Sequence, residues 1–105
     1  MSPSERKEIM LSPKALTEFI GTYTLTPMNI YYTTRTSTLG IYLENDHLIA
    51  QIENQSKVKL LPESGAKFFS KIPDVQIEFL KDKQGNIVGL DLYQDRDHST
   101  GVKTS

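Results

Sequence analysis

The sequence predicts a mostly β domain: an antiparallel barrel of about eight strands, preceded by one short N-terminal helix. Short segments rich in Tyr, Thr, Ile and Val recur at intervals of roughly 8–12 residues along most of the chain. Turn-forming Asn, Asp, Gly and Pro residues separate these segments. The connections are too short for the crossover that parallel strands need, so neighbouring strands are expected to be antiparallel. An up-and-down barrel satisfies this order and leaves no strand edge unpaired.

Length and composition fit one small folded domain. The chain has 105 residues, which is room for a single core. Leu, Ile, Val and Phe make up about 27% of it, above the roughly 20% typical of disordered chains. The 12 Lys and Arg residues nearly cancel the 13 Asp and Glu residues, which argues against electrostatic binding to nucleic acid or acidic membranes. The lack of Cys excludes a disulfide framework, a thiolate zinc site and a cysteine nucleophile.

The first residues differ from the rest. Residues 1–11 are polar and without a clear period, so we expect a flexible arm or linker ahead of one domain at residues 12–105. No apolar segment follows the basic residues of this stretch, which therefore does not resemble a signal peptide. If a parent protein is exported, its signal would lie outside this chain, and the localisation stays open. No apolar run approaches the ~20 residues that span a bilayer.

A short helix is expected to open the domain. Ser12 offers an N-cap oxygen, and Pro13 suits the first helical position. Gly21 is expected to end the helix after about two turns. Apolar side chains at spacing i, i+3 and i+4 share one face: Leu16, Phe19 and Ile20. A helix this short is marginal by itself, so this face must pack on the rest of the domain.

The expected strands follow one another with short turns between them. They comprise residues 22–25, 30–35, 39–44, 47–53, 57–61, 67–71, 75–81 and 87–94, with a weak further segment at 101–104. Val75, Ile77 and Phe79 alternate with polar residues and define one face of their strand. Gly85 lies where a hairpin loop needs a positive φ angle. In the strand after this loop, Asp91 is expected to face outward, and the residues expected to face inward are Val88, Leu90 and Leu92.

Five sequence blocks, in this order and spacing, resemble a small, poorly characterised domain at the C-terminus of many beta-lactamase-related serine hydrolases, the class C beta-lactamase and penicillin-binding-protein-like enzymes. The blocks are Leu16-x-x-Phe19-Ile20-Gly21-x-Tyr23, Leu48-x-Ala50-Gln51, Leu60-Leu61-Pro62-Glu63-Ser64, Phe68-Phe69, and Gln76-Ile77-x-Phe79-x-x-Asp82-x-x-Gly85, the last continuing into Ile87-x-Gly89-Leu90-x-Leu92-Tyr93-Gln94. The resemblance covers roughly residues 7–94. The chain departs from the family at residues 27–40, which look longer than usual, and near Arg96, where a frequent Gly is absent.

The resemblance implies a lipocalin-like antiparallel barrel with an accessory role, because the hydrolase chemistry of these often exported proteins resides in a separate, larger domain. It carries over no catalytic residue. Gly21 would let the helix turn sharply into the strand that holds Tyr23. Phe68 and Phe69 would point to opposite faces, one into the interior and the other toward the helix or a partner. Structural roles in packing or turns are implied for Gly21, Tyr23, Pro62, Phe68, Phe69, Phe79, Gly85 and Gly89.

The residues themselves predict no catalytic, cofactor or metal site. A beta-lactamase-type active site needs Ser-x-x-Lys on the first turn of a helix. About 0.8 such spacings are expected by chance in a chain of this composition. Three occur, and none of them fits the first turn of a helix: Ser4/Lys7, Ser56/Lys59 and Ser64/Lys67. His47 and His98 are interpreted as solvated turn residues, because a metal site needs three or four convergent ligands. A catalytic triad built on His98 would lack a nucleophile elbow.

Two functions of different classes follow from these observations. The first is a non-catalytic accessory domain for stability, subunit contact or substrate access, whose partner is a serine hydrolase domain in cis or a second copy. The alternative is a stand-alone module that binds a small ligand inside the barrel. Large inward residues such as Ile77, Phe79 and Leu90 predict a filled core and favour the first function, and an independent enzyme ranks last. Tyr31 and Tyr32 form the candidate contact surface, because tyrosine suits interfaces.

Overall fold

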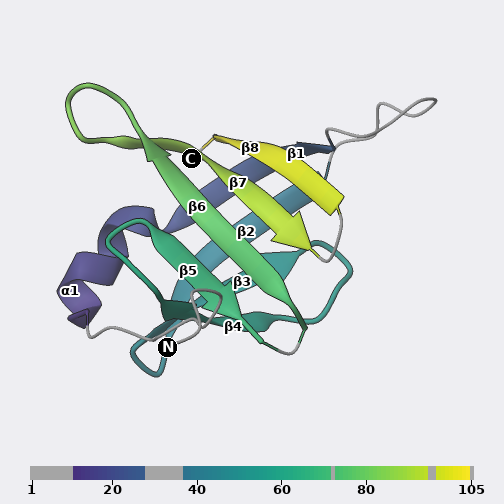
Figure 1. Ribbon diagram of the computed structural model, residues 1–105, viewed down its shortest axis with the longest axis horizontal. Coiled ribbons are helices and arrows are strands. Elements are labelled where there is room, and N and C mark those ends of the chain that lie inside the picture. Colours follow the sequence, from purple (N-terminus) through teal and green to yellow (C-terminus); the bar gives the residue numbers. More distant parts are fainter. Residues whose placement is uncertain (1–10, 28–36, 72, 95–96, 105) are drawn as a thin grey trace, which may run out of the picture.

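The computed structural model describes residues 11–27, 37–71, 73–94 and 97–104. They form a closed antiparallel barrel of eight strands with one short helical segment before it (Figure 1), which confirms the predicted fold class. The helical segment comprises α1 (Pro13–Leu16) and the 3-10 turn η1 (Thr17–Phe19). The strands are β1 (Gly21–Pro27), β2 (Ser37–Glu44), β3 (His47–Ile52), β4 (Val58–Pro62), β5 (Lys67–Ser70), β6 (Val75–Lys81), β7 (Ile87–Gln94) and β8 (Asp97–Lys103).

Each strand pairs with its neighbours in sequence, and β1 pairs with β8 to close the ring. Strands β6 and β7 have the predicted bounds. The strand expected at 30–35 falls within residues 28–36, outside the described part of the chain. The weak segment at 101–104 is the end of β8, which begins at Asp97. Its first half is polar and carries little β propensity, so pairing with β7 and β1 extends this strand beyond what local sequence indicates.

The helical segment begins as predicted and ends differently. The Ser12 hydroxyl accepts a hydrogen bond from the backbone N–H of Ala15 at 3.2 Å, and Pro13 occupies the first helical position. Ile20 is already extended, with φ −66° and ψ 135°, and Gly21 is the first residue of β1. Among the described glycines only Gly85 has a positive φ. The expectation that Gly21 ends the helix was therefore wrong, because an extended Ile20 redirects the chain without a left-handed residue.

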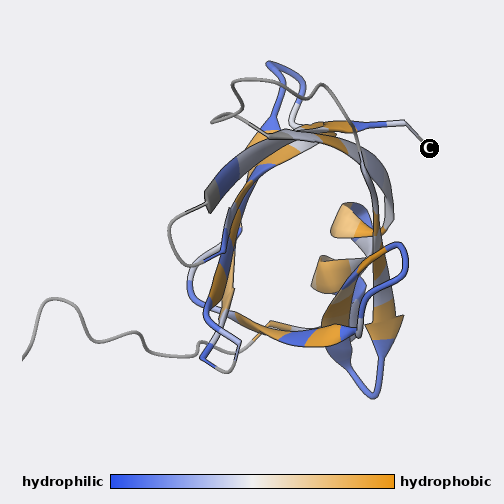
Figure 2. Ribbon diagram, turned by 90° about the vertical axis from the view of Figure 1, so that its right-hand side faces the viewer, coloured by the Kyte–Doolittle hydropathy of each residue, from blue (hydrophilic) through white to orange (hydrophobic). Residues whose placement is uncertain are grey.

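An aromatic cluster closes one end of the barrel. The Phe19 ring lies 4.6 Å from that of Phe79 and 5.1 Å from that of Phe68, measured between centroids. The Tyr23 hydroxyl donates a hydrogen bond to the Phe19 carbonyl at 2.8 Å, tying the helical segment to β1. Figure 2 looks through the ring of strands, and in this view the helical segment lies within its outline. Leu16 and Phe19 thus complete the core as predicted. Ile20 does not share their face: it is extended and 37% exposed, so its expected packing on the domain was wrong.

The side chains of Phe68 and Phe69 point to opposite faces of β5, as predicted. Phe68 belongs to the interior cluster, while Phe69 is also buried but lies outside that cluster. The interior ring is also the one that meets the helical segment, through Phe19. The helical segment covers the end of the barrel, and the expectation that the ring of Phe69 meets the helix or a partner stays a prediction.

A β-bulge changes which residues of β7 face the core. Leu80 pairs with Gly89, but Lys81 pairs with Ile87, so Val88 has no partner on β6. The extra residue reverses the alternation at this point. Ile87 is buried in the core, and Val88 is 44% exposed. The prediction that Val88 faces inward was therefore wrong, whereas Leu90 and Leu92, beyond the bulge, are buried as predicted.

Candidate functional site

At the end of the barrel opposite the helical segment, side chains of the described residues line a small cavity. Phe79, near the end of β6, contacts the helical segment, whereas Val75, at the start of β6, lines this cavity. Its apolar lining consists of Leu39, Ala50, Ile52, Val58, Val75 and Leu92. Gln55, Ser56 and Gln94 add polar groups. We call it the mouth cavity.

The mouth cavity has a volume of about 20 Å³. A space of roughly 10–15 Å³ holds one water molecule. Pockets for small-molecule ligands measure roughly 300–1,000 Å³. The mouth cavity is therefore large enough for a water molecule and far too small for a typical organic ligand.

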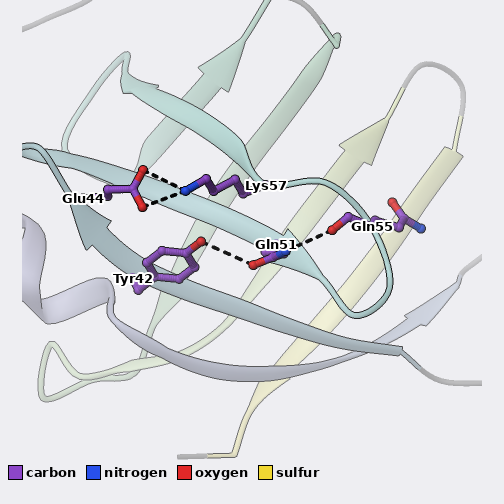
Figure 3. A network of polar contacts seen from close by, with 5 residues as sticks. All are labelled: Tyr42, Glu44, Gln51, Gln55 and Lys57. Atoms are coloured by element: carbon purple, nitrogen blue, oxygen red, sulfur yellow. Dashed lines mark hydrogen bonds and ion pairs between the residues drawn. The ribbon is translucent and has the colours of Figure 1, made fainter.

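A polar network on the outer wall fixes the turn that borders the mouth cavity (Figure 3). The Tyr42 hydroxyl donates to Oε1 of Gln51 at 3.3 Å, and Nε2 of Gln51 donates to the Gln55 carbonyl at 3.0 Å. Beside it, Nζ of Lys57 donates to both carboxylate oxygens of Glu44, at 3.1 and 2.9 Å. Hydrogen bonding to Glu44 and the charge of its carboxylate raise the pKa of Lys57. Strands β2 and β3 thereby hold the β3–β4 turn from outside.

A second, larger depression lies on the outer surface, where β4 and β5 diverge. The two strands pair at Leu61 with Phe69 and at Pro62 with Phe68. Beyond these pairs a groove of about 330 Å³ opens. Its lining combines three lysines, Lys57, Lys59 and Lys71, with Val58, Leu61, Ser70 and Pro73. We call it the lysine groove.

The charges in the lysine groove are unevenly balanced. Glu44 neutralises Lys57. Within the described part of the chain, no ion pair engages Lys59 or Lys71, and no acidic side chain lines the groove. Ser70 is the one polar residue in the described ranges that is counted as buried, at 7% exposure. The groove therefore presents two unneutralised ammonium groups beside apolar surface.

The residues singled out by sequence lie mostly in packing or turn positions. Tyr23 and Phe79 are in the core, and Pro62 ends β4 as a buried residue. Gly85 has φ 85° in the hairpin loop, as its position predicts. A Cβ atom at Gly89 would overlap the carbonyl oxygen of Gly101 on β8. Tyr31 and Tyr32, the candidate contact surface, lie outside the described residues.

The histidines occupy different environments. His47 is the first residue of β3, and its Nδ1 lies 3.0 Å from the carbonyl oxygen of Asn45 in the preceding turn, so the interpretation of His47 as a turn residue was wrong by a narrow margin. His98 instead lies on β8, where Nε2 is 3.1 Å from Oδ1 of Asp91 and the ring stacks on Tyr93 at 4.4 Å. The interpretation of His98 as a solvated turn residue was wrong, because β8 begins earlier than predicted. Across the described ranges, no group of three or more His, Cys, Asp or Glu residues could hold a metal ion.

The sequence interpretation missed the lysine groove. Lys57 and Lys59 alternate on β4 and its approach, which is a usable signal for one face of a strand. Lys71 follows β5 and joins them only through the fold. The divergence of the two strands has no counterpart in composition or periodicity.

Comparison with protein families gives one match. The model of a family described as a domain of unknown function (DUF3471) covers residues 5–103. The chain belongs to this family. The match extends over all eight strands and so includes both the mouth cavity and the lysine groove. Searches of the curated proteins and of the solved structures returned no significant match.

Membership of this family fits the resemblance to a small, uncharacterised domain, and the family description assigns no activity. One further feature bears on partners. In the described ranges, no helix has both the length and the apolar character required to cross a bilayer.

Proposed function

We propose that this chain is a non-catalytic accessory domain that acts beside a beta-lactamase-related serine hydrolase domain. Its contribution would be stability, subunit contact or access of substrate to the hydrolase. The five sequence blocks that resemble domains appended to such enzymes support the association. The observation that carries the proposal is the filled interior of the barrel.

A filled barrel presents its outer surface to other molecules. The side chains of Phe19, Tyr23, Phe68 and Phe79 occupy one end, and the mouth cavity that the described residues line at the other end measures about 20 Å³. Outside, apolar side chains are exposed on β6, β7 and β8, among them Leu80, Val88 and Val102. This distribution favours contact with another protein surface over storage of a ligand inside.

A domain exchange tests the proposal. A serine hydrolase whose C-terminal domain shares the five sequence blocks of this chain is prepared in three forms: intact, truncated before that domain, and with this chain in its place. We expect the exchanged form to unfold at a higher temperature than the truncated form and to recover its kcat/KM on a chromogenic ester. Equal melting temperatures and equal rates for the exchanged and truncated forms would contradict an accessory role.

The isolated chain provides the second measurement. We expect no turnover of ester, beta-lactam or D-peptide substrates, and native mass spectrometry should give the bare chain mass as monomer or dimer. Hydrolysis by the isolated chain would overturn the non-catalytic assignment. A co-purified small molecule would instead favour the ligand-binding alternative.

A further inference from the structure

We infer that the lysine groove between β4 and β5 is a docking site for an extended, acidic polypeptide segment. The inference rests on the proposed function. It adds the surface through which an accessory domain would contact a neighbouring chain and the chemistry of the partner segment. Three features of the groove carry it: an unpaired strand edge, unneutralised lysines and apolar surface.

The strand edge comes from the short pairing between β4 and β5. Residues Val58, Lys59 and Leu60 pair with β3 on one side. On the other side, pairing with β5 begins only at Leu61. The seam beside the start of β4 therefore leaves backbone hydrogen-bonding groups that an added extended chain can satisfy. A polypeptide fits this edge better than a small anion does, because it supplies backbone donors and acceptors in register.

The lysines select the charge of the docking segment. Lys59 and Lys71 both line the groove and have no ion pair within the described ranges, whereas Lys57 already holds Glu44. Carboxylates on the docking segment would supply the missing partners. Exposed ion pairs are individually weak and are screened by salt. They would therefore set selectivity and salt dependence, while the backbone pairing and apolar contacts hold the segment in place.

The remaining lining suits an apolar side chain. Leu61 and Pro73 provide apolar contact beside the lysines. The groove volume of about 330 Å³ accommodates side chains of a short peptide segment.

The test uses a fluorescently labelled octapeptide that alternates Glu with Val, and a matched peptide with Gln in place of Glu. Binding to the full chain is measured by fluorescence anisotropy at low and at high salt. We expect binding of the Glu peptide that weakens with salt, and weaker binding of the Gln peptide. Backbone amide shifts in NMR spectra should concentrate at Val58–Leu61 and Ser70.

Charge-reversal variants locate the site. We expect Lys59→Glu with Lys71→Glu to weaken binding roughly tenfold, since two favourable charge contacts become repulsive. Lys14→Glu with Lys83→Glu makes the same change in net charge at exposed positions outside the groove and should leave affinity within about twofold. Circular dichroism melts of both variants establish that each is folded before binding is compared.

Several outcomes would overturn the inference. These are no binding of the Glu peptide, equal loss of affinity in both charge-reversal variants, or equal affinity for the Gln peptide. Anionic vesicles or an oligonucleotide that bind through the same lysines, without peptide binding, would assign the groove to another anion. If the peptide fails to bind but the exchanged hydrolase is stabilised, the accessory role stands and only the assignment of this groove falls.

Discussion

Tyr23 determines how the helical segment meets the barrel. The residue is completely buried, its ring packs 5.9 Å from that of Phe79, and its hydroxyl donates to the Phe19 carbonyl. Burial raises the pKa of the Tyr23 phenol, because a phenolate would lose its hydration inside the core. One side chain thus connects β1, the end of η1 and the aromatic interior.

Replacing this phenol tests the value of its hydrogen bond. We expect Tyr23→Phe to lower the free energy of unfolding at neutral pH by about 1 kcal/mol, since the Phe19 carbonyl loses its buried donor. Urea denaturation followed by circular dichroism measures the difference. An unchanged denaturation midpoint would mean that the hydrogen bond contributes nothing in water.

The same residue gives a pH dependence with a definite sign. In the unfolded chain the Tyr23 phenol ionises near its ordinary pKa of 10.0, whereas the folded chain keeps it protonated to higher pH. Its contribution is therefore complete below pH 10.0 and is lost as the pH rises above that value, by about 1.4 kcal/mol per pH unit. Urea denaturation between pH 8 and pH 11 should show a shallower decline in Tyr23→Phe than in the parent chain. Tyr93→Phe, at an exposed position, is the matched control.

At the scale of the element, the β6–β7 hairpin combines a predictable turn with an unpredictable bulge. Oδ1 of Asp82 accepts hydrogen bonds from the backbone N–H groups of Gln84 and Asn86, each at 2.9 Å, and Gly85 supplies the left-handed residue. Three residues after Gly85, β7 carries one extra residue, Val88, that has no partner on β6. The bulge places Ile87 in the core and Val88 outside.

Two alanine substitutions in neighbouring residues measure the effect of this bulge. We expect Ile87→Ala to cost about 2–4 kcal/mol of unfolding free energy, because it opens a space in the core. Val88→Ala should cost less than about 0.5 kcal/mol, because its side chain is largely in water. Denaturant titrations of both variants make the comparison, and a larger loss at Val88 would contradict the described register.

Gly89 of β7 lies against the backbone of β8. Gly89 faces the backbone of Gly101, where an added Cβ has no space. We expect Gly89→Ala to destabilise the domain by about 2 kcal/mol or more, because backbone atoms must move apart. Gly65→Ala, at a turn position with no heavy atom within 4 Å of the added Cβ, is the control. Thermal melting of the pair should show a large shift for Gly89→Ala and little for Gly65→Ala.

The parts of these elements that sequence could predict are those with local causes. The bounds of β6 follow from the alternation of Val75, Ile77 and Phe79, and the turn after it follows from Gly85. The start of β8 was not predictable, because its polar residues adopt a strand only between β7 and β1. The lysine groove was missed for a similar reason: Lys59 and Lys71 meet only because β4 and β5 diverge.

Closure of the barrel is a property of the whole molecule. The pairing of β1 with β8 extends from Tyr23, opposite Lys103, to Pro27, opposite Ser99. Beyond it, the backbone N–H of Thr104 donates a hydrogen bond to the Thr22 carbonyl at 2.8 Å. Without β8, the edges of both β1 and β7 would be left unpaired. The stability of the domain therefore depends on its last strand as a unit.

A chain ending at residue 96 tests this dependence. We expect it to lose the cooperative thermal transition and to aggregate, because two adjacent strand edges and part of the core become exposed. A chain that lacks only residues 104–105 should keep the transition. Size-exclusion chromatography and circular dichroism distinguish the two results, and a folded monomer ending at residue 96 would contradict the role given to closure.

The order of strands also has a consequence for folding rates. Seven of the eight strand pairings join neighbours in sequence, and only the β1–β8 pairing brings together distant parts of the chain. Pairings between distant segments carry a larger loop-closure entropy and tend to form late. Substitutions in the β1–β8 seam should therefore accelerate unfolding while barely slowing folding, whereas those in the β6–β7 hairpin should slow folding. The lifetime of the folded barrel would then be set at the seam where its two ends meet.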